Sequence, residues 1–288
     1  MTRHDIFLPC LAGAGGCGAL ALRLWQWSTG YDPEAQLFSH RHPASLLLLL
    51  VGTAVALVLI LALRRLTPPH NFPQGFFCPS LFYMTLVAAG ALLMMGAGVL
   101  GLKEGMEQLA LWRLDPASQL LTYPAALILC ALLSLAAGPA ALAVGRGIYR
   151  GEHTPSASLL ALFPPMAALV WLFATHLAHG TDPVLLSYGP YLAAALCLTL
   201  AHYYLAALFH GRLRPRRAVF FALMGLFFAL FSLGDGLTPF SLALSAAFSL
   251  SALAGAWSLL RGAYGPPWPE RMPSGAEEDA SRDTEDER

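Results

Sequence analysis

Eight runs of about twenty mostly apolar residues, separated by short polar segments, make up most of the chain. A helix needs about 20 such residues to cross the hydrocarbon core of a bilayer. Charged residues make up 12% of the sequence, which is about half of their share in a soluble domain. The sequence therefore predicts an all-α integral membrane protein, a bundle of about eight transmembrane helices in four hairpins. The expected spans cover residues 6–25, 43–63, 79–100, 120–144, 157–176, 184–209, 218–233 and 240–260.

Arginines gather in every second connection between these runs. Short loops that carry such clusters stay on the cytoplasmic side, because they are translocated poorly. The densest cluster, four arginines in six residues, lies between the sixth and seventh runs. We therefore place this loop and both termini in the cytoplasm of a bacterial cell, with the protein in the cytoplasmic membrane. The ten arginines on this predicted inner side are Arg3, Arg64, Arg65, Arg146, Arg150, Arg212, Arg214, Arg216, Arg217 and Arg261.

The end of the chain differs in composition from the rest. Residues 262–288 hold eight acidic residues and little apolar surface, too little to fold alone. We divide the chain into a polytopic transmembrane domain, residues 1–261, and a disordered acidic cytoplasmic tail, residues 262–288. The expected partners are the bilayer itself, anionic lipid headgroups at the inner arginines, and a protein that docks on the tail. We expect no nucleic acid and no cofactor.

Two features predict irregular helices. Proline removes a backbone N–H from the helical hydrogen-bond ladder, so we expect breaks at Pro139 and at Pro164-Pro165. The mixed segment 103–115 places Met106 and Trp112 at spacings that suit a short helix lying on the membrane surface.

One ionisable side chain, His202, falls deep in a predicted span, and Tyr203 follows it. Ionisable groups at such depth are costly and usually functional, so His202 and Tyr203 are candidate substrate-binding residues. The alternative is a neutral imidazole that is hydrogen-bonded between helices. The predicted spans contain no Asp or Glu, which disfavours carriers that use intramembrane carboxylates.

The segment that follows the first span is rich in charge and aromatic residues. Arg23 lies at the predicted membrane boundary, and Asp32 and Glu34 are potential partners for it. Arg23 and Asp32 are therefore further candidate binding residues. The alternative is interfacial anchoring by Arg23 and the neighbouring tryptophans.

His176, His179 and Asp182 gather at the outer end of the fifth span. Two histidines three residues apart share one helix face, as metal ligands do. A fraying helix end is the alternative, and the His-Glu-x-x-His spacing of zinc hydrolases is missing. We therefore assign no metal and no catalytic residue.

Two glycine motifs have plain structural interpretations. Gly13–Gly18 matches G-x-G-x-x-G, but it lies inside a span and not in the βαβ unit that a dinucleotide site needs. We expect it to bring helices close together. Asp235, between two glycines, resembles the glycine–aspartate motifs of membrane aspartyl proteases. Because the second aspartate of such a site is absent, we expect a turn residue.

Short motifs stand in the first quarter of the chain: Leu22–Trp25, Thr29–Gly30, His42–Ala44 and Asn71–Pro73. Together they resemble a pattern in uncharacterised bacterial multi-pass membrane proteins. The resemblance implies a multi-pass membrane protein and assigns no activity or functional residue.

Three functions fit these observations. The leading hypothesis is a permease-like or carrier-like component for a small or amphipathic solute, since broken helices and small-residue interfaces occur in carriers. The first alternative is a membrane-embedded enzyme that acts on a lipid-linked substrate through His202 or the outer histidines. The second is a structural or regulatory subunit that docks through its arginines or its tail.

Overall fold

The computed structural model describes residues 4–32, 34, 37–39, 42–64, 66, 77–116, 120–152, 155–179 and 185–264. Helices dominate these ranges, and eight helical spans within them are long and apolar enough to cross a membrane. The prediction of a helical fold with eight helices long and apolar enough to span a membrane is confirmed. The helices are α1 (His4–Gly30), α2 (Pro43–Leu63), α3 (Leu81–Leu114), α4 (Thr122–Arg150), α5 (Pro155–Leu160), α6 (Phe163–His179), α7 (Leu185–Phe209), α8 (Pro215–Ser232) and α9 (Pro239–Tyr264).

Two short elements complete the described fold. Strands β1 (Tyr31–Asp32) and β2 (Leu37–Phe38) pair antiparallel after α1, and the 3₁₀ helix η2 (Leu233–Asp235) follows α8. Gly236 ends η2 with a positive φ of 67°, a conformation that glycine adopts without steric cost. Both elements lie in predicted outer connections.

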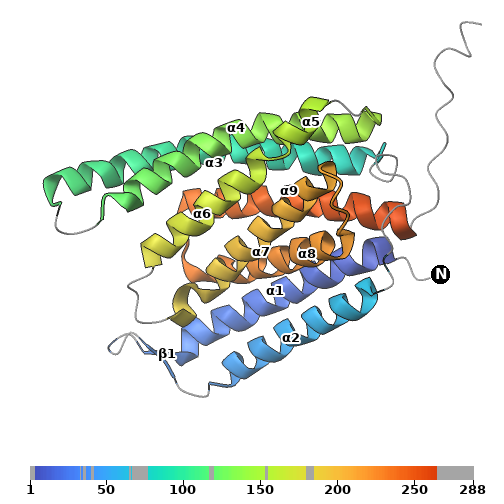
Figure 1. The fold of residues 1–288 in the computed structure, drawn as a ribbon. Coiled ribbons are helices and arrows are strands. Elements are labelled where there is room, and N and C mark those ends of the chain that lie inside the picture. The colour runs from blue at the N-terminus through green and yellow to red at the C-terminus, as the bar shows by residue number, and fades with distance from the viewer. Residues whose placement is uncertain are drawn as a thin grey trace, which may run out of the picture.

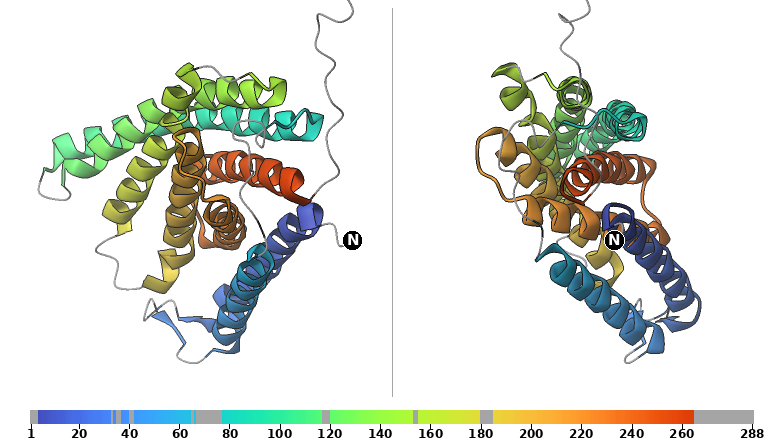
Figure 2. Two further views of the ribbon diagram at one scale, coloured as in Figure 1. Left: turned by 45° about the vertical axis from the view of Figure 1, so that its right-hand side comes forward. Right: turned by 90° about the vertical axis from the view of Figure 1, so that its right-hand side faces the viewer.

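Consecutive helices pack as the predicted hairpins: α1 with α2, α3 with α4, α6 with α7 and α8 with α9. Helices of different hairpins also pack, notably α3 with α9, α4 with α6 and α1 with α8. Figure 2 shows α1 and α2 on one side of the molecule, α3 and α4 on the other, and α6 to α9 between them. The first residues of α1 and the last of α9 lie at the same end of the bundle (Figure 1).

Helix α3 differs most from its predicted span. It continues through residues 103–114, so the prediction of a separate surface helix is wrong. At 1.5 Å per residue its 34 residues extend over about 51 Å, and Figure 1 shows α3 and α4 projecting together beyond the other helices. The reason lies in small residues beyond the predicted boundary. A Cβ at Gly105 would lie 2.8 Å from Ile128 of α4, so glycine lets the two helices stay in close contact there.

The two predicted proline breaks have different outcomes. Helix α4 runs without interruption through Pro139, so the irregularity expected there is wrong. Membrane helices tolerate such a proline when neighbouring groups satisfy the freed carbonyl, and Gly138 beside it packs closely on Ala91 and Met95 of α3. The span that contains Pro164-Pro165 is divided into α5 and α6, as predicted. Both prolines fall in the first turn of α6, where no N–H donor is needed.

The Gly13–Gly18 motif lies within α1 and serves helix packing. A Cβ at Gly15 would lie 2.8 Å from Val55 of α2, and one at Gly16 would lie 2.9 Å from Leu230 of α8. These two glycines therefore hold α1 against both neighbours, which agrees with the packing interpretation. No described atom lies within 4 Å of a Cβ added at Gly13 or Gly18, so these two glycines face away from the bundle.

Candidate functional site

Five helices, α3, α4, α6, α7 and α9, surround two cavities. The first, the His202 cavity, lies between the beginning of α3 and the end of α4 and has a volume of about 70 Å³. The second, the Glu104 cavity, lies between the second half of α3 and the beginning of α4 and has a volume of about 210 Å³. Since α3 and α4 contribute opposite ends to the two cavities, the cavities lie toward opposite ends of one bundle.

His202 is 4% exposed and presents a hydrogen-bond acceptor at the first cavity. Its Nδ1 lies 2.8 Å from the carbonyl oxygen of Leu198. A carbonyl only accepts, so Nδ1 carries the proton, and Nε2 of the neutral ring is an acceptor. Nε2 is buried and has no hydrogen-bond partner among the described residues. The one hydrogen bond of the ring goes to its own helix, not to a neighbour as the alternative interpretation expected.

The rest of the His202 cavity is largely apolar, and the helix break contributes to it. Ala161, Pro164 and Pro165 line it where α5 gives way to α6, and Ser251 of α9 adds a hydroxyl. The break that the prolines predict therefore lies at the wall of a cavity, where irregular backbone is tolerated in membrane proteins.

The Glu104 cavity is more polar. Glu104 is the one carboxylate among its lining residues, and Thr175, Thr238 and Ser241 add hydroxyls. His179 also lines this cavity, with its ring stacked on that of Tyr188 at a centroid distance of 5.0 Å. The arrangement offers one anionic group and several hydroxyls to a small solute.

Aromatic rings separate the two cavities. Trp171 lines the Glu104 cavity, donates from Nε1 to the hydroxyl of Tyr191 over 2.7 Å, and stacks on Phe248 at a centroid distance of 5.4 Å. Phe248 in turn meets the ring of His202 edge-on at 5.1 Å. Trp171 and Phe248, called the aromatic septum below, are 1% and 0% exposed. A continuous series of buried ring contacts therefore runs from the Glu104 cavity to His202.

Polar groups beside the septum are few. The hydroxyl of Thr199 on α7 lies 3.0 Å from the carbonyl oxygen of Ala168 on α6 and 2.7 Å from that of Ala195, so its single O–H donor is already engaged. Ser245 lies three residues before Phe248 on α9, and its buried Oγ makes no hydrogen bond to any described residue. Ser241, which lines the Glu104 cavity, is four residues earlier and so shares a helix face with Ser245.

The structure does not bring the four predicted binding residues together. Tyr203 is 49% exposed beside Tyr204, because adjacent helix residues point about 100° apart. Asp32 lies in β1, where its Oδ1 accepts a hydrogen bond from the backbone N–H of Glu34 over 3.0 Å. Within the described ranges, the ion pair of Arg23 is made with Asp235 and not with Asp32. A binding role for any of the four stays a prediction, and His202 alone lines a cavity.

Arg23 pairs with a residue that the sequence analysis interpreted as a turn residue. Its Nε donates to Oδ1 of Asp235 over 2.5 Å, and both side chains are 2% exposed. Arg23 also donates to Gln26 over 2.6 Å, and Trp27 donates to Asp235 over 3.3 Å. The expected pairing of Arg23 with Asp32 or Glu34 is therefore wrong, because the chain returns to this end of α1 through η2. Asp235 does stand in a turn, but it is buried and paired.

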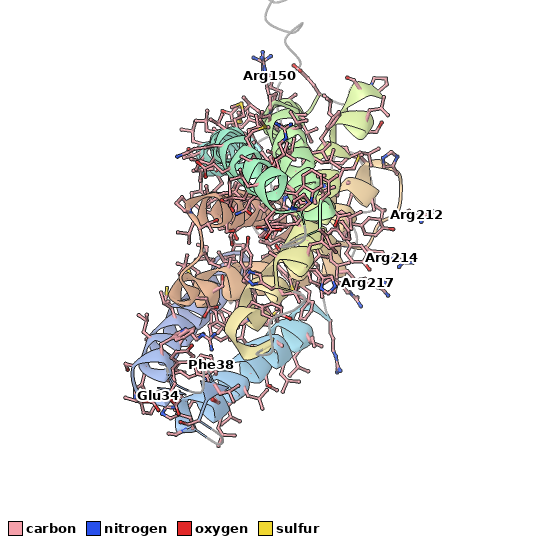
Figure 3. The ribbon with its side chains drawn as sticks, turned by 90° about the vertical axis from the view of Figure 1, so that its left-hand side faces the viewer. Glu34, Phe38, Arg150, Arg212, Arg214 and Arg217 are labelled. Atoms are coloured by element: carbon pink, nitrogen blue, oxygen red, sulfur yellow. The ribbon has the colours of Figure 1, made fainter. Side chains whose placement is uncertain are left out.

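Those arginines of the predicted inner side that the structure describes lie at the end of the bundle where α1 begins. Figure 3 shows Arg212, Arg214 and Arg217 together at one edge and Arg150 apart from them on α4. Arg150 makes an exposed ion pair with Glu152 at 3.7 Å. Arg3, Arg65, Asp182 and residues 265–288 of the predicted tail lie outside the described residues. Residues 262–264, predicted to belong to the disordered tail, are instead helical and end α9. The orientation of the bundle in a membrane stays a prediction.

No protein-family model, no curated protein and no solved structure matches this chain. Within the described ranges, no three His, Cys, Asp or Glu side chains come together as they would around a metal ion. The site must therefore be interpreted from its own geometry.

Proposed function

We propose that this protein is a carrier that moves a small polar solute across the membrane. The observation that supports it is the pair of cavities at opposite ends of the same five helices, separated by the aromatic septum. A carrier opens a central site to each side in turn while a barrier closes the other side. Trp171 and Phe248, buried between the two cavities, suit the role of such a barrier.

The lining residues limit the solute. Neither cavity has lysine or arginine among its lining residues, whereas Glu104 and Nε2 of His202 are fixed acceptors. A solute that carries several hydrogen-bond donors, with or without a positive charge, complements such groups. Aromatic rings at the septum favour a compact cation or an uncharged hydroxylated molecule over an anion.

The test uses side-specific labelling of single cysteines and needs no knowledge of the solute. The five natural cysteines are first replaced by alanine. Thr175→Cys then reports on the Glu104 cavity, Ser251→Cys on the His202 cavity and Ser245→Cys on the septum between them. A charged, membrane-impermeant thiol reagent is applied to oriented vesicles from one side at a time.

We expect Ser245→Cys to react from both sides, because a carrier exposes its centre alternately. Thr175→Cys and Ser251→Cys are expected to react faster from opposite sides. Ser232→Cys is the matched control, since Ser232 is equally buried on α8 but lines neither cavity. If Ser245→Cys reacts from one side only or from neither, while the two cavity cysteines react, the bundle does not alternate and the carrier proposal is wrong.

A further inference from the structure

A groove lies where α2 ends and α8 begins, beside α7, and it is separate from the two cavities described above. Its volume is about 380 Å³. At one end it is lined by the guanidinium-bearing residues Arg64, Arg216 and Arg217 together with Tyr204. The remaining lining residues are apolar and extend along the helices: Ile60, Leu63, Phe220 and Phe221.

The charged end of this groove lacks a counter-charge within the described part of the chain. Arg216 donates from Nε to the backbone carbonyl of Leu66 over 2.7 Å, which orients its guanidinium. Arg217 donates to the hydroxyl of Tyr204 over 3.2 Å and lies 5.8 Å from the centre of that ring. Ion pairs in the described ranges involve other residues, so no described carboxylate neutralises Arg64, Arg216 or Arg217.

The start of α8 adds to the positive potential. Arg216 and Arg217 stand in the first turn of α8, and no side chain caps the helix at Arg214. The amino end of a helix carries a partial positive charge and favours anions. The positive charges of Arg216 and Arg217 repel the amino end of α8, and an anion bound between these groups would relieve the repulsion.

The apolar end of the groove extends along α2 and α8, away from the arginines. Ile60 is 43% exposed, and Phe221 stacks on Tyr204 at a centroid distance of 5.8 Å, so rings and aliphatic groups form one continuous wall. A ligand that fits this groove is anionic at one end and apolar along the other. Guanidinium forks match phosphate oxygens in a bidentate manner, and membrane lipids of the inner leaflet supply phosphate joined to acyl chains.

We propose that this groove binds an anionic phospholipid. Its phosphate lies between Arg64, Arg216 and Arg217, and the first part of its acyl chains lies on Ile60, Phe220 and Phe221. The site is independent of the proposed transport function, because neither cavity shares a lining residue with the groove.

The test compares binding of phosphatidylglycerol with that of phosphatidylcholine to the full chain in detergent, by native mass spectrometry. We expect phosphatidylglycerol to bind preferentially. The variant Arg64→Gln/Arg216→Gln/Arg217→Gln should bind it at least about tenfold more weakly, since each arginine near a headgroup contributes on the order of a fewfold in affinity. The matched control, Arg146→Gln/Arg150→Gln/Arg212→Gln, removes the same charge outside the groove and should retain at least about a third of the affinity.

A second variant is a control for misfolding or altered membrane topology of the triple glutamine variant. Arg64→Lys/Arg216→Lys/Arg217→Lys keeps the charge but not the bidentate geometry, and we expect an intermediate loss of phosphatidylglycerol affinity.

Equal phosphatidylglycerol affinity in all variants overturns the proposal. Full competition by inorganic phosphate would assign the groove to a free anion. Phosphatidylglycerol binding that appears only after removal of residues 265–288 would assign the groove to the acidic tail. Either result overturns the lipid proposal.

Discussion

The Arg23–Asp235 pair and the His202 cavity are two polar regions buried in the same apolar bundle, and they differ in how far their polar groups bond to other elements. Around Arg23, groups from α1, α2 and η2 bond to one another: Arg23 with Asp235 and Gln26, and Gln26 with Ser45 over 2.7 Å. Oδ2 of Asp235 has no partner among the described residues. At His202, one nitrogen is used within its own helix and the other has no described partner.

This difference separates a structural role from the binding role that we propose for His202. The members of a buried charge pair stabilise each other, and removing one partner is strongly destabilising because the other charge stays buried alone. A buried acceptor without a partner contributes nothing to stability and is costly to keep. The Arg23 region thus holds the end of α1 against η2, which follows α8, whereas Nε2 of His202 has no described partner.

The largest expected effect comes from removing one partner of the charge pair. In Asp235→Ala the guanidinium of Arg23 stays buried without its counter-charge, a change that costs about 3–5 kcal/mol. Thermal unfolding of the purified protein in one detergent measures this loss. The double variant Arg23→Met/Asp235→Leu removes both charges and should recover more than half of it. If the double variant is as unstable as the single one, the pair is not the source of the stability.

A smaller loss of stability is expected from adding a side chain at Gly145, in the wall of the His202 cavity. A Cβ at Gly145 would clash with Val87, and such overpacking costs about 1–3 kcal/mol. Gly145→Ala should therefore lower the unfolding temperature. Gly13→Ala is the matched control, because no described atom lies within 4 Å of its Cβ position, and alanine favours a helix over glycine by about 1 kcal/mol. A destabilised Gly13→Ala protein would contradict this account of the packing.

The smallest effect on stability is expected at His202 itself. His202→Leu removes an unpartnered acceptor together with a single hydrogen bond within α7, so the free energy of unfolding should change by no more than about 1 kcal/mol. The same unfolding measurement, beside Asp235→Ala, tests the contrast between the two regions. A loss as large as that of Asp235→Ala would show that His202 is part of the structural framework.

The accuracy of the predicted helix bounds depends on whether charged residues stand only at the ends of the helix. Helix α2 has the predicted bounds, because an unbroken apolar run stands between Pro43 and the arginine at position 64. Helix α3 exceeds its predicted span, because Lys103 and Glu107 suggested a boundary where the helix in fact continues. The two form an exposed pair at 3.9 Å within one helix, and such i, i+4 pairs support a helix outside the membrane.

The candidate site was predictable only in part. His202 could be selected because an ionisable residue stands out inside an apolar run. The Glu104 cavity was missed, because Glu104 follows the predicted end of its span and no local pattern joins it to Tyr191 or Ser241. The septum was also missed, since Trp171 and Phe248 are ordinary apolar residues in separate helices.

The sequence by itself determined the number of apolar helices, the break at Pro164-Pro165 and the segregation of arginine to alternate connections. Each of these depends on composition within about twenty residues, the length over which a helix crosses a bilayer. Tertiary structure alone decided which polar groups meet. Arg23 and Asp235 are 212 positions apart, and Trp171 reaches Phe248 only because α6 and α9 border the same bundle. Such contacts depend on how helices pack side by side, and helix packing depends on all of their surfaces together.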